Sequence, residues 1–269
     1  MCTDASVTSF FEDSMYKNYI FDFYGTLVDI HTEEEHSSLW RQMAELYRVY
    51  GAEYTPAQLR QAYLDACQQA EKVLKEETGY EYPEIDLQKV FVTLLETAPG
   101  YHPTKKIPNV EAWSYEIANT FRVLSRKRFH TYPHTIETLK KLKEAGCHVC
   151  ILSNAQKCFT MPEMEQSGVL PYIDSVYLSS EYQMRKPQKE FLAELIEKEH
   201  LLKNESIMIG NDCFSDVAIA VKNQMHSIYL DTGSHTKRQN QKMIEQVCRG
   251  RKKWMPVTIE GDIRKILSV

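Results

Sequence analysis

The chain has 269 residues, a length that accommodates one core domain together with an inserted one. With 43% hydrophobic and 26% charged residues it has the composition of a globular protein, and no apolar run reaches the roughly 20 residues that cross a bilayer. The formal net charge of −5 gives no general attraction for nucleic acid or anionic membranes, so we expect neither as a partner.

Residues 1–15 are predicted to form an N-terminal extension. The stretch Met1–Ser14 carries three acidic residues and no basic one, so it does not resemble a secretory signal, and Met15 is an alternative start. Seven cysteines, an odd number scattered along the chain, argue against a disulfide framework. They favour a reducing compartment, and we expect a cytoplasmic protein.

Cys147 and Cys150 form a C-x-x-C pair, a spacing that also occurs in zinc and redox sites. The pair lies in an apolar run typical of a buried strand, where residues three apart point to opposite faces. We therefore interpret both cysteines as structural.

Short apolar runs alternate with helix-like segments in residues 16–28 and 130–230. The runs are Tyr19–Phe21, His148–Leu152, Val176–Leu178, Ile207–Ile209 and Ile228–Leu230, and the clearest helices between them are Ile136–Ala145 and Lys189–Glu199. Strands that alternate with helices predict an α/β fold with a doubly wound parallel sheet. Continuous apolar strands fit burial on both faces of that sheet.

About a hundred residues without strand-like sequence separate the first predicted strand from the rest. Four helices are predicted there, at roughly 33–50, 55–77, 84–97 and 109–127, and Thr55 followed by Pro56 is a typical helix start. We therefore predict an α/β core of residues 16–30 and 129–269, with residues 31–128 inserted as an all-helical cap domain.

Residues 237–253 hold seven basic side chains against one acidic residue, Glu245. Such a stretch can bind nucleic acid, but aromatic residues do not interleave with these charges. We predict a solvated helix face instead.

Polar side chains follow the predicted strands at their carboxyl ends, where open α/β sheets place their ligand crevice. Asp22 follows the first strand, and Gly25 permits a tight turn after it. The later strands are followed by Ser153, Asn154, Lys186, Asp212 and Asp216. Taken singly, each has an ordinary structural explanation, such as a helix cap or a solvated loop residue.

Together these side chains predict a catalytic site. A carboxylate can form a covalent aspartyl intermediate, which divides one difficult displacement into two easier steps. Lys186 would neutralise charge around Asp22 and an anionic small-molecule substrate. Asp22 and Asp212 would hold Mg²⁺, a hard cation that prefers oxygen ligands.

The same residues resemble the four motifs of the haloacid dehalogenase superfamily. The motifs are matched by Asp22-Phe23-Tyr24-Gly25-Thr26, by Leu152-Ser153-Asn154, by Ser179-Ser180-Glu181 through Arg185-Lys186-Pro187, and by Gly210-Asn211-Asp212 with Asp216. The resemblance covers nearly all of residues 16–232, and the helical insertion matches the cap that the family carries between its first two motifs.

The resemblance implies a role for each matched residue. Asp22 would be the nucleophile and a metal ligand, and Ser153 would bind the transferring group, with Tyr24, Gly25 and Asn154 beside it at the substrate. Lys186 would hold both nucleophile and substrate. The metal would also be bound by Asp212, by the carbonyl oxygen of Tyr24, and by Asp216 directly or through its waters.

Two departures bear on the chemistry. Phosphatases of the family usually carry a second aspartate two residues after the nucleophile, where this chain has Tyr24, and the stretch from Asp22 to Asp29 instead resembles 2-haloacid dehalogenases. Arg41 lies where those enzymes carry a cap arginine for the substrate carboxylate. However, they need no metal and lack an acid at the position of Asp212.

An unused carboxylate beside Asp22 would cost repulsion between like charges. The sequence therefore favours a Mg²⁺-dependent phosphatase acting on a small phosphorylated metabolite through an aspartyl-phosphate intermediate. The alternatives are a metal-independent 2-haloacid dehalogenase with an ester intermediate on Asp22, and a binding protein of the same fold without efficient turnover.

Overall fold

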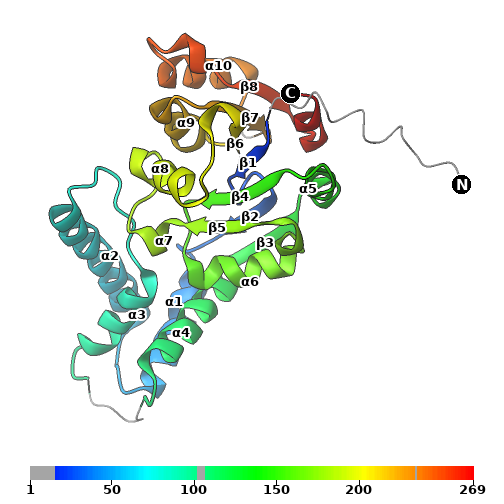
Figure 1. Ribbon diagram of the computed structural model, residues 1–269. Helices are drawn as coiled ribbons and strands as arrows, with labels where there is room; N and C mark the ends of the chain where they lie inside the picture. The colour runs from blue at the N-terminus through cyan, green and yellow to red at the C-terminus, as the bar shows by residue number, and fades with distance from the viewer. Residues whose placement is uncertain (1–15, 102–106, 234) are drawn as a thin grey trace, which may run out of the picture.

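The computed structural model describes residues 16–101, 107–233 and 235–269, so the expected extension 1–15 lies outside the described residues. Its central element is a six-stranded parallel sheet in the order β5-β4-β1-β6-β7-β8 (Figure 1). The strands are β1 (Asn18–Phe21), β4 (His148–Ser153), β5 (Ser175–Leu178), β6 (Ser206–Gly210), β7 (His226–Asp231) and β8 (Val257–Glu260). The first described strand, β1, lies in the middle of this sheet, and later strands are added on both sides of it. This order places a ligand crevice at the carboxyl ends of β1, β4 and β6. The predicted α/β fold is confirmed.

Alternate residues of β1 enter two separate cores, one on each face of the sheet. Tyr19 and Phe21 pack with α5 (Thr135–Glu144) and the C-terminal 3₁₀ turn Ile263–Ser268, and Ile20 packs with α8 (Lys189–Lys198) and α9 (Ala218–Asn223). Cys147 joins the first core and Cys150 the second, as their spacing predicted. The remaining core helices are α6 (Lys157–Ser167), α7 (Ser179–Tyr182) and α10 (Lys237–Val247).

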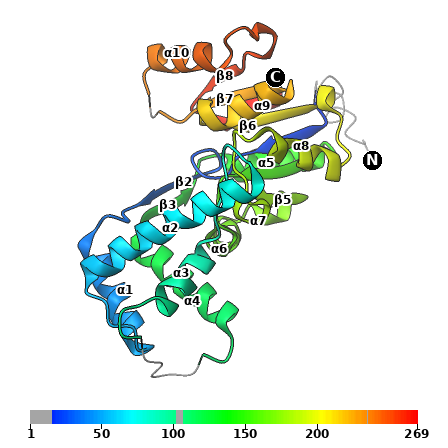
Figure 2. The same cartoon turned by 90° about the vertical axis from the view of Figure 1, so that its left-hand side faces the viewer.

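A unit of four helices lies to one side of the sheet (Figure 2). It contains α1 (Ser37–Val49), α2 (Pro56–Thr78), α3 (Leu87–Glu96) and α4 (Val110–Ser125), close to the four helices predicted there. Its own core is rich in aromatic residues, including Trp40, Tyr47, Tyr63, Phe91 and Phe121. Thr55 and Gln58 form a capping box at the start of α2, with Pro56 in the first turn.

Two strands connect this helical unit to the sheet, where the sequence predicted none. β2 (Val28–Thr32) and β3 (Arg126–Thr131) pair antiparallel as a two-stranded ribbon. Most of their residues are exposed or half-buried, so their sequences carry no apolar run that would indicate a strand. The edge strand β8 was missed for the same reason, since only Ile259 is buried in it.

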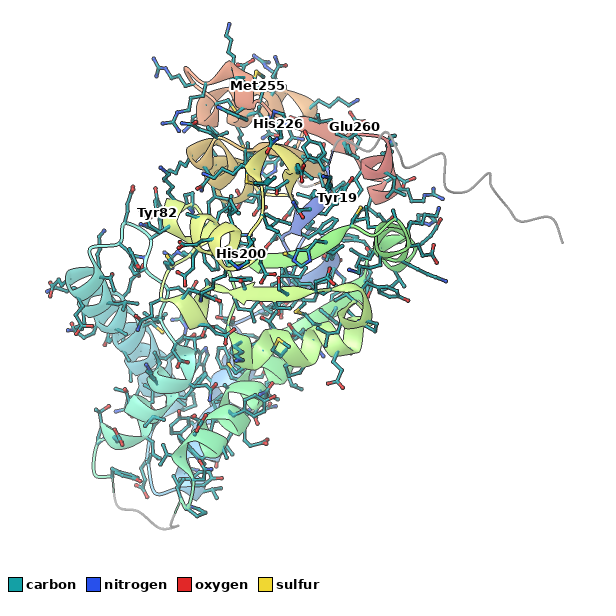
Figure 3. All side chains as sticks on the ribbon, viewed as in Figure 1. Tyr19, Tyr82, His200, His226, Met255 and Glu260 are labelled. Atoms are coloured by element: carbon teal, nitrogen blue, oxygen red, sulfur yellow. The ribbon has the colours of Figure 1, made fainter. Side chains whose placement is uncertain are left out.

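The connection between α2 and α3 touches the α/β core. The carbonyl oxygen of Tyr82 accepts a hydrogen bond from the backbone N–H of Arg185 at 2.9 Å, and the Lys222 ammonium lies 4.8 Å from the centre of the Tyr82 ring. Figure 3 labels Tyr82 on this loop, between α2 and the core helices. The helical unit therefore contacts the core at this loop as well as through the β2–β3 ribbon.

The basic stretch 237–253 begins with α10, which buries Asn240 and Ile244. All seven basic side chains of the stretch are exposed, three of them on α10 and four after it. This is the solvated face that the sequence predicted. Among the helices of the described segments, none is long and apolar enough to cross a membrane.

Candidate active site

The carboxylate of Asp22 lies at the carboxyl end of β1. The backbone N–H of Asp22 donates to the carbonyl oxygen of Ile209 on β6 at 2.8 Å, which extends the pairing of β1 with β6 by one residue. Oδ1 accepts hydrogen bonds from Ser153 Oγ at 2.8 Å and from Lys186 Nζ at 2.7 Å. Among the described residues, Oδ2 has one hydrogen-bond contact, a long one of 3.5 Å from Thr26 Oγ1, so Oδ2 is held less firmly than Oδ1.

Lys186 is 2% exposed and joins three elements of the site. Its ammonium lies 2.7 Å from each of three oxygens, those of the Asp22 carboxylate, the Asp216 carboxylate and the Leu152 carbonyl. Burial lowers the pKa of a lysine, but the Asp216 and Asp22 carboxylates outweigh it and the pKa of Lys186 is raised. Lys186 therefore keeps its positive charge beside Asp22.

Asn154 positions Lys186 by pairing with its backbone. The Asn154 side-chain oxygen accepts the Lys186 N–H at 2.7 Å, and its amide nitrogen donates to the Lys186 carbonyl oxygen at 3.0 Å. The sequence predicted a substrate-binding role for Asn154. In the structure both ends of its amide are engaged in orienting the lysine loop.

Asp216 is buried, and both of its carboxylate oxygens are engaged. Oδ1 faces Lys186, and Oδ2 accepts the backbone N–H of Asp212 at 3.0 Å. Burial raises the pKa of Asp216 to about 7, although Lys186 opposes the shift. A Cβ on Gly210 would lie 2.1 Å from Asp216 Oδ2, so the carboxylate needs a glycine there. This arrangement suits a residue that supports Lys186 and Asp212 better than a direct metal ligand.

Asp212 is exposed at the carboxyl end of β6. Its Oδ1 accepts the backbone N–H groups of Phe214 and Ser215 at 2.7 and 3.2 Å, while Oδ2 has no hydrogen-bond partner within the described segments. Lys186 links Asp22 to Asp216, whose carboxylate in turn holds Asp212. The Lys186 ammonium contacts two carboxylates, those of Asp22 and Asp216, and Asp216 also accepts the backbone N–H of Asp212, so three acidic residues form one hydrogen-bonded group with a single ammonium. Their hard oxygen donors fit a divalent cation such as Mg²⁺.

The contacts of the Tyr24 hydroxyl group argue against a catalytic role for it. The hydroxyl donates to the Glu163 carboxylate and lies 3.1 Å from Thr160 Oγ1. Burial raises the pKa of Tyr24, and the nearby Glu163 charge raises it further. The hydroxyl therefore stays protonated at neutral pH and directed at Glu163, while its carbonyl oxygen remains a possible metal ligand.

Glu163 on α6 is the functional neighbour that sequence reasoning missed. It is 2% exposed and accepts from Arg122 on α4 at 2.9 and 3.0 Å and from Arg126 on β3 at 2.9 Å. The Arg122 guanidinium lies 5.3 Å from the centre of the Tyr24 ring. We call Tyr24, Glu163, Arg122 and Arg126 the Glu163 cluster. It ties the helical unit and the ribbon to Tyr24, two residues after Asp22.

A cavity of about 720 Å³ adjoins this site and lies between the helical unit and the core. It extends to Tyr24, two residues after Asp22, and to Asn154, the residue after Ser153. Its charged lining residues are Glu34, Glu71, Glu84, Arg122 and Arg185. Its size is that of a site for a small molecule.

Arg41 does not line this cavity, contrary to the role that the resemblance implied. It is exposed on α1, because the buried stripe of that helix is formed by Leu39, Trp40, Met43, Ala44 and Tyr47. The structure brings together Asp22, Ser153, Asn154, Lys186, Asp212, Asp216, Tyr24 and Gly25, and leaves Arg41 outside.

The chain is similar to known proteins in both sequence and fold. The profile of the family described as haloacid dehalogenase-like hydrolases matches residues 19–230. A phosphoglycolate phosphatase of Vibrio vulnificus is 30% identical over 103 residues, which are 38% of this chain and 44% of that protein. The chain thus matches less than half the length of the curated relatives it resembles.

Two solved structures share the fold. An L-2-haloacid dehalogenase gives a TM-score of 0.54 at 16% identity, with 95% of this chain and 98% of that one covered. A phosphatase of the same superfamily from Thermococcus onnurineus gives 0.53 at 19% identity, with 82% and 88% covered. At these identities the likeness concerns the fold alone. The family match spans most of the chain, and the protein therefore belongs to the haloacid dehalogenase-like hydrolases.

Proposed function

We propose that the protein is a Mg²⁺-dependent phosphatase that hydrolyses a small phosphorylated metabolite through an aspartyl-phosphate on Asp22. The observation that carries this proposal is that three acidic residues, Asp22, Asp212 and Asp216, form one hydrogen-bonded group with the single ammonium of Lys186. Without a cation, such a group of carboxylates would repel one another and an anionic substrate. In this proposal residues 31–128 act as a cap over a core formed by residues 16–30 and 129–269.

The first step forms a bond between a carboxylate oxygen of Asp22 and phosphorus, and breaks the bond between phosphorus and the ester oxygen. Lys186 and Ser153 orient the nucleophile through Oδ1, and the positive charge of Lys186 would favour an anionic phosphoryl group beside Asp22. Mg²⁺ held by Asp22, Asp212 and the Tyr24 carbonyl would supply charge neutralisation for the phosphate oxygens.

The second step is attack of water on the phosphorus of the aspartyl-phosphate, which releases phosphate and restores the carboxylate. The first step delivers a proton to the leaving alcohol, and the second removes a proton from the attacking water. Tyr24 is poorly suited to transfer these protons because its hydroxyl has a raised pKa and points at Glu163. The protons would then pass to and from water, and esters with good leaving groups should react fastest.

Dehalogenation of a 2-haloacid is the second candidate, since Tyr24 replaces the usual acid/base aspartate. That reaction requires a cation for the substrate carboxylate. The arginines of the described cavity lining, Arg122 and Arg185, are already paired with Glu163 and Glu71. Arg41 is exposed elsewhere. The phosphatase is therefore the function that the site supports better.

A paired assay tests the proposal. Phosphate release from a phosphomonoester panel that includes p-nitrophenyl phosphate is measured with Mg²⁺ or with chelator, beside halide release from 2-haloacids. We expect Mg²⁺-dependent phosphate release that Asp22→Asn abolishes without unfolding the protein, because an amide cannot form the intermediate. Metal-independent halide release would favour the dehalogenase, and ligand binding without turnover would favour a binding protein.

A further inference from the structure

The two arginines that line the cavity beside Asp22 are each paired with a carboxylate of the protein. Arg122 makes two hydrogen bonds to Glu163, and Arg185 NH2 lies 3.1 Å from Glu71 Oε1. Glu84 accepts hydrogen bonds from Ser179 at 3.0 Å and Gln156 at 3.1 Å. The cavity therefore has no unpaired arginine, among its described lining residues, for a second anionic group of a substrate.

Glu34 is the acidic lining residue whose carboxylate is not engaged. No hydrogen bond or ion pair to this carboxylate occurs within the described parts of the chain, although the Glu34 carbonyl oxygen is fixed by Trp40 Nε1 at 2.7 Å. Glu34 is half-buried, and burial raises the pKa of its carboxyl while Arg122 opposes the shift. A half-buried carboxylate without a partner is costly, and a donor from a ligand would relieve that cost.

The lining carries more negative than positive charge. Three carboxylates, those of Glu34, Glu71 and Glu84, face two guanidinium groups. A carboxylate or second phosphate on the substrate would enter an environment of its own sign. A hydroxyl or ammonium group would instead find an acceptor.

We propose that Glu34 selects phosphomonoesters whose alcohol portion carries a hydrogen-bond donor, a hydroxyl or an ammonium group, and that the cavity disfavours those with a second anionic group. This inference rests on the proposed phosphatase function and names its substrate class. The cavity volume of about 720 Å³ leaves room for an alcohol as large as a sugar.

The test uses three esters with the same two-carbon skeleton, namely 2-hydroxyethyl phosphate, 2-aminoethyl phosphate and phosphoglycolate. They differ in one group, a hydroxyl, an ammonium or a carboxylate, so their kcat/KM ratios report the preference of the cavity. A second set, glucose 6-phosphate, glucosamine 6-phosphate and 6-phosphogluconate, repeats the comparison with a larger alcohol. We expect the carboxylate member of each set to be at least tenfold poorer.

Glu34→Gln should reduce the preference for 2-aminoethyl phosphate over phosphoglycolate at least tenfold. Glu35→Gln is the matched control. It removes the same charge one residue away, from an 81% exposed side chain that does not line the cavity, and should change no ratio. Calorimetric binding of the same esters to Asp22→Asn, with and without Glu34→Gln, should show the same order without turnover.

The outcomes separate the two proposals. Equal or better use of phosphoglycolate by a protein that hydrolyses p-nitrophenyl phosphate would overturn the role of Glu34 and leave the phosphatase standing. No hydrolysis of any phosphomonoester would overturn the phosphatase, and binding to the Asp22→Asn protein would then decide the preference of the cavity by itself. Identical ratios in the Glu34→Gln and Glu35→Gln proteins would also overturn the role of Glu34.

Discussion

Replacing Glu163 by alanine should destabilise the protein strongly, because it removes the anion that holds two arginines. The Glu163 side chain is 3% exposed, and those of Arg122 and Arg126 are 12% and 21% exposed. Removing one partner of a buried ion pair costs about 3–5 kcal/mol, since the remaining charge stays buried without compensation. Arg126 can turn partly toward water, and Thr160 stays near the Tyr24 hydroxyl, so we expect a loss of about 3 kcal/mol.

Urea unfolding followed by far-UV circular dichroism and by tryptophan fluorescence would measure this loss, with coincident curves as the test of a two-state transition. Glu165→Ala is the control, because Glu165 lies on the same helix and is exposed. Its effect should stay within about 0.5 kcal/mol. A difference of less than about 1 kcal/mol between the two variants would refute the reasoning that the Glu163 cluster stabilises the fold.

The site gives three other expected outcomes. Asp212→Ala should weaken Mg²⁺ binding at least tenfold in calorimetry, and an unchanged affinity would contradict the proposed metal site. Tyr24→Asp should accelerate hydrolysis of esters with poor leaving groups by up to about 10²-fold, because the new carboxyl group can act as acid and base. The gain for p-nitrophenyl phosphate should be smaller, and a folded, Mg²⁺-binding variant that gains no activity would contradict this prediction. Gly25→Ala should lower the melting temperature more than Gly146→Ala does: both glycines have φ near +78°, but only at Gly25 would the new Cβ meet a neighbour, at 2.4 Å. Equal losses would show that backbone strain alone is responsible.

Much of the fold follows from local patterns in the sequence. Five of the six strands of the main sheet are apolar runs, because parallel strands buried on both faces must be apolar throughout. The helices of the inserted unit follow from apolar spacing and from starts such as Thr55-Pro56. The ribbon of β2 and β3 could not be predicted in this way, since neither strand buries a continuous face.

The chemical groups of the site also follow from the sequence, because strand ends in a parallel sheet gather at one edge. From the order of Asp22, Ser153, Lys186 and Asp212 along the chain, the sequence predicts that four strand ends lie close together. The contacts among Asp22, Ser153 and Lys186 agree with it.

Only the tertiary structure decided which charges face the cavity. Arg41 and Arg122 are both helix arginines, and nothing local distinguishes them, yet Arg41 is exposed and Arg122 lies against Tyr24. Glu163 in the same way has the sequence context of a solvated helix residue and is 2% exposed. Strand burial is set by residues close in the chain, whereas the partner of a charge is set by the packing of helices that lie far apart in it. The sequence by itself therefore determined the sheet and the order of the polar groups at its strand ends, and the packing of α4 against α6 determined how Tyr24 is held.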